Sequence, residues 1–283
     1  MADTLPEVVF FWLPGCGNCT HLKGYLTARG VAHRAVNVVA EPDALAAVSD
    51  PARRVPPFLL VGGQWVAGDE AAIEAALGLP AAEKRADMPP RTLIERCARM
   101  LELSSALAGQ LPAANYDDPT PTMSDFEAAQ RFFADGRPYV PHATSKSLVH
   151  HIAQHGEKTC RLLLASDGIH ELGFAIDGTG EYNFFGEPEP DTPMYRVIGK
   201  MRLAASDLTA WLRIPLEDDG LWRVVQTHRG PRTMRQYLKY QTIGLIQHTR
   251  QLVDLVERLG IKPATGVADD DVEGLGMPAG LWD

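Results

Sequence analysis

The chain has 283 residues, of which 45% are hydrophobic and 22% charged, and its formal net charge is −9. This composition is typical of a folded globular protein with one large or two ordinary domains, and it argues against extensive disorder. The negative charge argues against a surface for nucleic acid or anionic lipid, since such surfaces need clustered Lys and Arg. We therefore expect small molecules or proteins as partners.

The N-terminal sequence MADTLPEVVFFWLPG lacks the basic and long apolar regions of a signal peptide. No stretch of the chain reaches the roughly 18 apolar residues of a membrane span. We therefore expect a cytoplasmic protein without membrane contact. Four cysteines are too few for a secreted scaffold stapled by disulfides. In a reducing compartment, a C-x-x-C sequence indicates redox chemistry or metal binding.

Residues 1–80 alternate between strand and helix patterns, which predicts an α/β domain. The expected order is β-α-β-α-β-β-α, with elements at residues 7–13, 19–30, 32–39, 42–50, 57–63, 64–68 and 69–78. The strands 57–63 and 64–68 are expected to form a hairpin. This order places the C-x-x-C sequence between the first strand and the first helix.

The rest of the chain is predicted to be all-α. Residues 81–91, which carry prolines and charges, are expected to form a linker. Four segments beyond it show an apolar stripe with helical period, at residues 92–111, 144–166, 193–213 and 233–260. They predict an antiparallel four-helix bundle over residues 92–262, which could form a homo-oligomer through an apolar face.

The segments outside these helices carry weaker signals. Residues 167–192 are rich in Gly and Pro and predict a packed loop or a small hairpin. Residues 263–283 have no period and are expected to form a C-terminal tail, solvated at its acidic run 269–273 and anchored by Trp282.

The sequence CGNC contains Cys16 and Cys19 at the expected start of the first helix. Free backbone N–H groups and the helix dipole stabilise a thiolate there, which lowers its pKa. Cys19, one turn later, is placed to displace a sulfur that Cys16 has attacked. Zinc sites also use C-x-x-C, but tetrahedral zinc takes four ligands and only His21 lies nearby. The spacing favours a redox pair over a metal half-site or a chance pair.

Residues 1–80 resemble a glutaredoxin, which has a thioredoxin-like fold. The resemblance covers the strand, C-x-x-C and helix opening, the step Val55-Pro56 before the third strand, and Gly68-Asp69 before the last helix. It implies a cis bond at Pro56, a Val55 backbone that pairs with a cysteinyl ligand, and a turn at Gly68 and Asp69 that holds glutathione. It also implies a thiol–disulfide oxidoreductase that uses glutathione or another low-molecular-weight thiol as reductant.

The sequence departs from the glutaredoxin pattern at several positions. Gly17 and Asn18 replace the usual Pro-Tyr between the cysteines, and Ala67 begins the usual Gly-Gly pair. Arg54 stands where Thr is common. With Arg53, it could meet a carboxylate of a thiol ligand, or both could be solvated loop residues. The expected substrate is a small thiol or disulfide, and protein disulfides are also open.

His151 and His155 lie four residues apart, on one face of an expected helix. A third histidine from another helix, such as His248, would complete a set of ligands for Zn, Ni or Fe with open positions for substrate. Residues 90–262 resemble the DinB-like four-helix bundle family, which includes thiol-dependent S-transferases and isomerases. The resemblance rests on the segment GPRTMRQYLKYQTIGLIQHTRQL at residues 230–252.

In the DinB-like family a divalent metal is held by one histidine of the second helix and an H-x3-H pair of the last helix. The resemblance assigns the first role to His151 and the second position of the pair to His248. The remaining position falls on Gly244, which has no side chain. Either the chain holds no metal here, or His155 supplies the nitrogen from another direction. The histidines could also be structural.

The leading hypothesis is a thiol–disulfide oxidoreductase that acts through the CGNC dithiol, coupled to a helical domain that binds a small, thiol-containing substrate. A first alternative is a metal-dependent or thiol-cofactor-dependent transferase or isomerase carried by the helical domain. A second is a redox-sensing binding module. Cys97 and Cys160 fall within expected helices and are interpreted as inert buried thiols.

Overall fold

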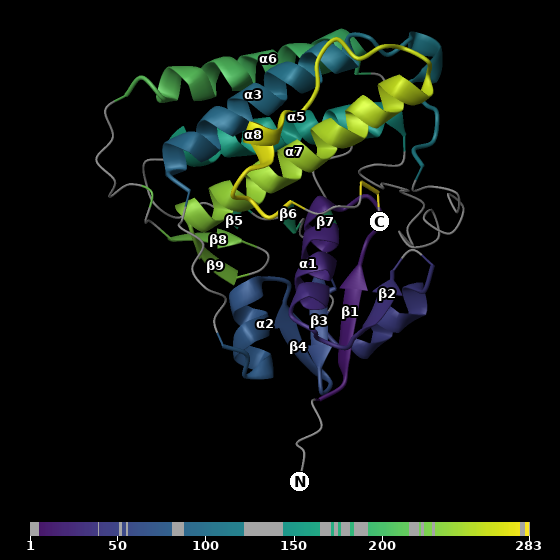
Figure 1. Ribbon diagram of the computed structural model, residues 1–283, viewed down its shortest axis with the longest axis vertical. Coiled ribbons are helices and arrows are strands. Elements are labelled where there is room, and N and C mark those ends of the chain that lie inside the picture. Colours follow the sequence, from purple (N-terminus) through teal and green to yellow (C-terminus); the bar gives the residue numbers. More distant parts are fainter. Residues whose placement is uncertain are drawn as a thin grey trace. The chain divides into compact units, whose positions relative to one another are not determined.

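The computed structural model describes residues 6–38, 40–50, 53–54, 56–80, 88–121, 144–164, 171–172, 175–176, 182–183, 192–214, 221, 224–227, 230–277 and 281–282. These residues form two compact units (Figure 1). The first contains the described residues from Pro6 to Pro80 with Leu281 and Trp282, and the second those from Met88 to Met277. No helix among the described residues is long and apolar enough to cross a membrane.

The first unit is built on a four-stranded sheet in the order β2-β1-β3-β4. Its strands are β1 (Val8–Trp12), β2 (Arg34–Asn37), β3 (Phe58–Val61) and β4 (Gln64–Ala67). β1 pairs in parallel with β2 and antiparallel with β3, and β3 and β4 form the predicted hairpin. Phe11 and Phe58 stack in the core, with 4.5 Å between ring centroids. β1 and β3 thus lie at the centre of the sheet.

The helices of the first unit are α1 (Gly17–Ala28), the 3₁₀ helix η1 (Pro42–Ala47) and α2 (Glu70–Leu77). The predicted element order is confirmed, with a 3₁₀ helix at the second helical position. Two side-chain contacts join α1 and α2, which lie side by side. His21 Nε2 lies 2.8 Å from Glu70 Oε1, and the Tyr25 hydroxyl donates to Glu74 at 2.7 Å. Burial, and then the hydrogen bond to Glu74, raise the pKa of Tyr25.

The second unit is a helical bundle, as predicted. Its helices within the described residues are α3 (Pro90–Ala108), α5 (Ser145–Leu164), α6 (Met194–Trp211), α7 (Met234–Arg258) and the short α8 (Asp269–Val272), with the 3₁₀ helix η3 (Ala113–Asn115). α3 and α5 both pack against α6 and α7. Every residue from Gln241 to Thr249 is buried, so α7 has no solvent-facing side over that stretch.

The long helices do not alternate in direction, so the expectation of an antiparallel bundle is wrong. Cys97 Sγ of α3 lies 3.2 Å from Thr242 Oγ1 of α7, and Ser104 Oγ lies 2.9 Å from Thr249 Oγ1. Both helices advance by seven residues between these contacts, which means that α3 and α7 run in the same direction. A helical period defines the buried face of a helix but carries no information on its direction.

α5 and α6 also run in the same direction. Glu157 pairs with Lys200 at 3.3 Å, and Cys160 Sγ donates to the Ala204 carbonyl at 3.4 Å. The connection between these two helices is long enough to return the chain to the starting end of the bundle, which short loops do not allow.

Short strands lie between the long helices of the second unit. β5 (Glu171–Leu172), β8 (Val224–Thr227) and β9 (Gly230–Thr233) form one sheet, and β6 (Ala175–Ile176) pairs antiparallel with β7 (Tyr182–Asn183). The β6-β7 pair confirms the predicted hairpin within residues 167–192. The β8-β9 hairpin was not predicted, because strands this short carry little alternation to recognise.

The C-terminal segment is partly packed. Asp271 is buried, accepts a hydrogen bond from Arg99 Nε at 2.7 Å and lies in α8, and Leu275 is 2% exposed. The expectation of a solvated acidic run is therefore wrong at Asp271, whose buried carboxylate is compensated by Arg99 of α3. The other acidic residues of the run, Asp269, Asp270 and Glu273, are exposed, as expected. Trp282 is buried within the first unit. Residues 278–280, residue 283 and the linker residues 81–87 lie outside the described residues.

Candidate functional site

Cys16 and Cys19 lie where β1 gives way to α1. Cys16 is the N-cap of α1, and its Sγ accepts a hydrogen bond from the Cys19 backbone N–H at 3.2 Å. Cys16 is half-buried, whereas Cys19 is 1% exposed. Their sulfurs are joined as a disulfide, and their Cα atoms are 5.2 Å apart. The accessible sulfur therefore sits at the helix N-terminus, where backbone N–H groups stabilise negative charge, and its partner lies behind it.

Backbone hydrogen bonds hold the loop that precedes Cys16. The Cys16 N–H donates to the Leu13 carbonyl at 3.2 Å, and the Gly15 N–H donates to the Trp282 carbonyl at 3.1 Å. Gly15 has φ of 76°, a left-handed conformation that favours glycine. Trp282 thus anchors the C-terminal segment, as predicted, and it does so at the residue next to Cys16.

The cis peptide bond lies between Pro56 and Pro57, one residue after the step that the resemblance implied. Val55, the predicted backbone partner of a ligand, lies outside the described residues. The bond before Pro56, to which the resemblance assigned the cis form, involves Val55 and therefore stays a prediction. Two X-Pro bonds follow one another here, and either can adopt cis at low cost, so the sequence does not distinguish them.

Gly68 lies directly against the backbone of Pro57. A Cβ on Gly68 would overlap the Pro57 carbonyl oxygen and lie 2.6 Å from the carbonyl carbon. Asp69 follows as the N-cap of α2, and its Oδ1 accepts a hydrogen bond from the Ala72 N–H at 3.0 Å. The predicted ligand-binding turn at Gly68 and Asp69 is thus packed against the proline that opens β3.

The two arginines before β3 make contacts within the first unit. Arg54 is half-buried, and its Nε donates to the Val48 carbonyl at 2.9 Å. Arg53 pairs with Asp50 at 3.3 Å and lies over the Trp65 ring, 5.2 Å from its centroid. These contacts hold the loop, and binding of a ligand carboxylate by Arg54 stays a prediction.

Three buried histidines gather in the second unit. His151 and His155 come from α5 and His248 from α7, and each is at most 4% exposed. One ring nitrogen from each lies within 4.8 Å of the other two. The Nε2 atoms of His151 and His155 are 3.1 Å apart, and the His151 and His248 ring centroids are 4.7 Å apart.

Gly244 accommodates the ring of His155. A Cβ on Gly244 would lie 3.2 Å from His155 Cε1, so the absent side chain leaves the space into which this imidazole reaches. The sequence left two alternatives open: either the chain holds no metal here, or His155 supplies the nitrogen that Gly244 lacks. The structure brings all three predicted histidines together.

Burial lowers the pKa of His155 to about 3, and the nearby His248 adds to this effect. Burial also lowers the pKa of His248 to about 4, against a hydrogen bond to Gln251 that acts in the opposite direction. Both imidazoles are therefore neutral at neutral pH, which is the form that binds metal ions. Three imidazole nitrogens at this spacing fit a first-row divalent ion, so this cluster could hold a metal.

Two glutamines of the cluster were not recognised from the sequence. Gln241 Oε1 accepts a hydrogen bond from His155 Nδ1, and Gln251 Oε1 accepts one from His248 Nδ1 at 2.8 Å. Both glutamines are buried. A signal existed in the many Gln, Thr and His residues of the last predicted helix, because a polar residue inside a bundle needs a specific partner.

Cys97 and Cys160 are free and buried, as predicted. Burial raises the pKa of each thiol to about 12. For Cys97 the hydrogen bond to Thr242 acts in the opposite direction. Neither thiol is suited to nucleophilic attack near neutral pH.

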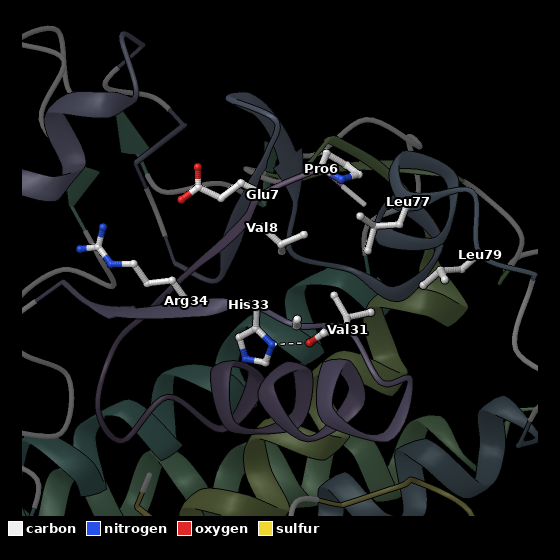
Figure 2. A pocket seen from close by; sticks show the side chains of 9 residues that line it. Pro6, Glu7, Val8, Val31, His33, Arg34, Leu77 and Leu79 are labelled. Atoms are coloured by element: carbon white, nitrogen blue, oxygen red, sulfur yellow. Dashed lines mark hydrogen bonds between the residues drawn. The ribbon is translucent and has the colours of Figure 1, made fainter. Parts of the chain in front are cut away.

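A pocket of about 420 Å³ lies at the start of β1, as Figure 2 shows. It is lined by Pro6, Glu7, Val8, Val31, Ala32, His33, Arg34, Leu77 and Leu79. His33 Nδ1 donates to the Val31 carbonyl at 2.8 Å on its wall. Cys16 follows the other end of β1, so this pocket is separate from the disulfide.

Comparison with known proteins identifies the first unit. Residues 8–66 match the glutaredoxin family model, a range that runs from β1 into β4 and includes both CGNC cysteines. No curated protein and no solved structure matches the chain. Together with the β/α architecture and the Cys16–Cys19 disulfide, this match shows that the chain contains a glutaredoxin domain at residues 8–66, followed by a helical region.

Proposed function

We propose that the chain is a thiol–disulfide oxidoreductase in which Cys16 is the attacking sulfur and Cys19 the resolving one. The observation that carries the proposal is the position of Cys16, half-buried at the N-cap of α1 with its sulfur bonded to the buried Cys19. A glutaredoxin domain implies the use of glutathione, which makes glutathione or a similar small thiol the reductant.

The reaction proceeds in two exchanges. The Cys16 thiolate attacks one sulfur of a disulfide or glutathione mixed disulfide, forms a new S–S bond, and the other sulfur leaves as a thiolate that takes a proton from water. Cys19 then loses its proton and attacks Cys16 Sγ, which releases the second half of the substrate as a thiol. Two molecules of glutathione reduce the Cys16–Cys19 disulfide and leave as glutathione disulfide, so two electrons pass in each cycle.

The ligand would bind along the segment that opens β3 and α2. The N-terminus of α2 offers backbone N–H groups to a carboxylate, and Gly68 lets the turn before Asp69 pack against Pro57. Arg54 lies in the loop before β3, where its hydrogen bond to the Val48 carbonyl holds it. These groups suit a small peptide thiol with free carboxylates, while protein disulfides would need only the exposed edge of Cys16.

The test is glutathione-dependent reduction of a small disulfide such as hydroxyethyl disulfide, measured for four full-length proteins. We expect Cys16→Ser to lose at least about a hundredfold in turnover, because no other described thiol can form the first adduct. Cys19→Ser should keep activity on glutathione mixed disulfides and lose it on protein disulfides, whose reduction needs both cysteines. The matched control is Cys97→Ser, which should behave as wild type. Full activity in Cys16→Ser would overturn the proposal.

The histidine cluster favours a second function, a metal-dependent transferase or isomerase in the helical region, as the resemblance to the DinB-like family implies. His151, His155 and His248 would hold the ion through ring nitrogens. When bound, a divalent ion supplies a Lewis acid that polarises a substrate atom or lowers the pKa of a thiol. The surrounding helices bury all three imidazoles and keep those of His155 and His248 neutral. A small, thiol-containing substrate would connect this activity to the glutaredoxin domain.

Metal analysis of the purified chain tests the second function. Stoichiometric zinc, nickel or iron in the wild type, absent from His248→Ala, would support it. A wild type that takes up no divalent ion from any of these metals would overturn it and leave the oxidoreductase proposal unaffected.

A further inference from the structure

We propose that Gln241 and Gln251 are positioning residues of a metal centre, in which each accepts the Nδ1 proton of one histidine and so directs its Nε2 into the cluster. This inference rests on the second function proposed above. It assigns roles to two residues that touch no metal themselves, and it identifies Nε2 as the ligand atom of His155 and of His248.

The hydrogen-bond chemistry determines which nitrogen carries the proton. The oxygen of a glutamine amide accepts hydrogen bonds and cannot donate them. Gln241 Oε1 lies against His155 Nδ1, and Gln251 Oε1 lies 2.8 Å from His248 Nδ1. Each Nδ1 therefore carries the hydrogen, and because each ring is neutral, each Nε2 holds a lone pair. A histidine ligand is commonly oriented in this way by a group on its other nitrogen.

The two glutamines act from positions that lock the rings. Gln241 is one turn from Gly244 on α7, and both face His155, the first at Nδ1 and the second at Cε1. This edge of the imidazole is thus fixed against α7. Gln251 follows His248 by three residues on the same helix, so its contact is local and is maintained by the helix itself.

The same geometry assigns a proton to His151. His155 Nε2 lies 3.1 Å from His151 Nε2, and because the nitrogen of His155 is an acceptor, His151 must donate from its Nε2 in the metal-free protein. A bound ion would take the place of this proton. His151 is therefore the histidine whose tautomer changes when metal binds, whereas His155 and His248 are already in the binding form.

The use of amides in place of carboxylates has an electrostatic consequence. Imidazole and amide side chains bring no negative charge to the ion, so a divalent ion keeps its full charge in this cluster. A carboxylate at position 251 would make the His248 ring more basic and would offset part of that charge. Gln251→Glu is therefore expected to bind metal more tightly than the wild type.

The experiment is titration of the metal-free full chain with Co²⁺, followed by the visible absorption of the bound ion and by competition with a chromophoric chelator. We expect Gln241→Leu and Gln251→Leu to lose about 10- to 100-fold in Co²⁺ affinity. The matched control is Gln247→Leu, because Gln247 is equally buried on α7 but its Oε1 accepts from Arg250 at 3.2 Å. Circular dichroism checks that each variant retains its helices.

The outcomes separate this inference from the second function. If the wild type and Gln251→Leu bind Co²⁺ with equal affinity while His248→Ala binds none, the metal centre stands and the role of the glutamines is overturned. If the wild type binds no Co²⁺, both are overturned together.

A second measurement needs no variant and is insensitive to misfolding. Side-chain ¹⁵N NMR of the histidines in the metal-free wild type should show a protonated Nδ1 and a bare Nε2 for His155 and His248, and the opposite tautomer for His151. A protonated Nε2 on His155 or His248 would overturn the inference.

Discussion

The two units hold their candidate reactive groups in opposite ways. In the first, the backbone of a helix N-terminus positions Cys16, and the sulfur is half-buried so that an incoming disulfide can reach it. In the second, His155 and His248 are wholly enclosed, and side-chain hydrogen bonds from Gln241 and Gln251 position them. An accessible nucleophile needs only amides around it, whereas a buried polar cluster must satisfy each of its own nitrogens.

The largest expected contrast is between the thiols of the two units. With the disulfide reduced, we expect Cys16 to react with iodoacetamide while Cys97 and Cys160 do not. Raising a thiol pKa from 9.0 to about 12 lowers its thiolate fraction about a thousandfold at about pH 8, and burial reduces the rate further. Timed alkylation followed by peptide mass spectrometry measures each rate.

The control for this contrast is the same reaction in denaturant, where all four cysteines should react at similar rates. Labelling of Cys97 in the folded protein as fast as Cys16 would show that the helical unit does not enclose its thiols as described.

The next effect is the acid sensitivity of the histidine cluster. The folded-state pKa values of His155 and His248, about 3 and about 4, lie below the ordinary value of 6.5. Between the folded-state and ordinary pKa values, the unfolded chain binds more protons than the folded one. The free energy of unfolding is therefore highest above about pH 6.5 and falls as pH is lowered toward 4. We expect the metal-free helical unit to lose about 5 kcal/mol over this range, roughly half from each histidine.

Urea unfolding at several pH values, followed by helical circular dichroism in the presence of a chelator, measures this loss. His248→Gln removes one of the two titrating groups and should give a shallower pH dependence. A slope equal to that of the wild type would mean that His248 is not held neutral by the fold.

A smaller effect is expected at the glycine that touches Pro57. Gly68→Ala should destabilise the first unit by about 2 kcal/mol, because the new Cβ would overlap the Pro57 carbonyl and the backbone must shift. The matched control is Gly24→Ala in α1, where a Cβ meets no described atom within 4 Å. That change should stabilise the unit by about 0.5–1 kcal/mol.

Thermal unfolding of the two glycine variants and the wild type measures both effects. Opposite signs would support the close contact of Gly68 with Pro57. Equal stabilisation by the two substitutions would exclude that contact.

The sequence predicted the first unit better than the second, for a physical reason. Strand and helix patterns alternate over residues 1–80, and the turn glycines and the CGNC motif separate them, so local signals determine most of the fold. The cis bond before Pro57 was not predicted, because Pro56 and Pro57 are chemically equivalent choices. The 3₁₀ helix η1 was expected as an ordinary helix, since a segment this short does not reveal its hydrogen-bond spacing.

In the second unit the helices were predicted within a few residues, but their relations were not. The directions of α3 and α7 and the ion pair of Asp271 with Arg99 depend on which surfaces meet in three dimensions. The partner of His155, Gln241 on another helix, depends on the same packing. Period and composition identify a buried face, and they carry no information about the opposing residue.

The smallest expected effect tests the register of those helices. Ser104 Oγ lies 2.9 Å from Thr249 Oγ1, and the Thr249 hydroxyl also donates to the Leu245 carbonyl at 2.7 Å. Because that second bond survives, Ser104→Ala should cost only about 1 kcal/mol. A double-mutant cycle with Thr249→Val should give a coupling of about 0.5–1 kcal/mol, measured by urea unfolding. Ser105→Ala is the matched control, since its hydroxyl donates within α3 to Glu102.

The coupling depends on the parallel arrangement of α3 and α7. If the two helices ran in opposite directions, the contact between Cys97 and Thr242 could still form. Ser104 and Thr249 would then lie about two turns from that contact in opposite directions and could not touch. Ser104→Ala and Thr249→Val would then act additively. A coupling that is present for Ser104 and absent for Ser105 therefore establishes the direction of α7, and with it the end of the bundle at which Gln241, Gly244 and His248 meet α5.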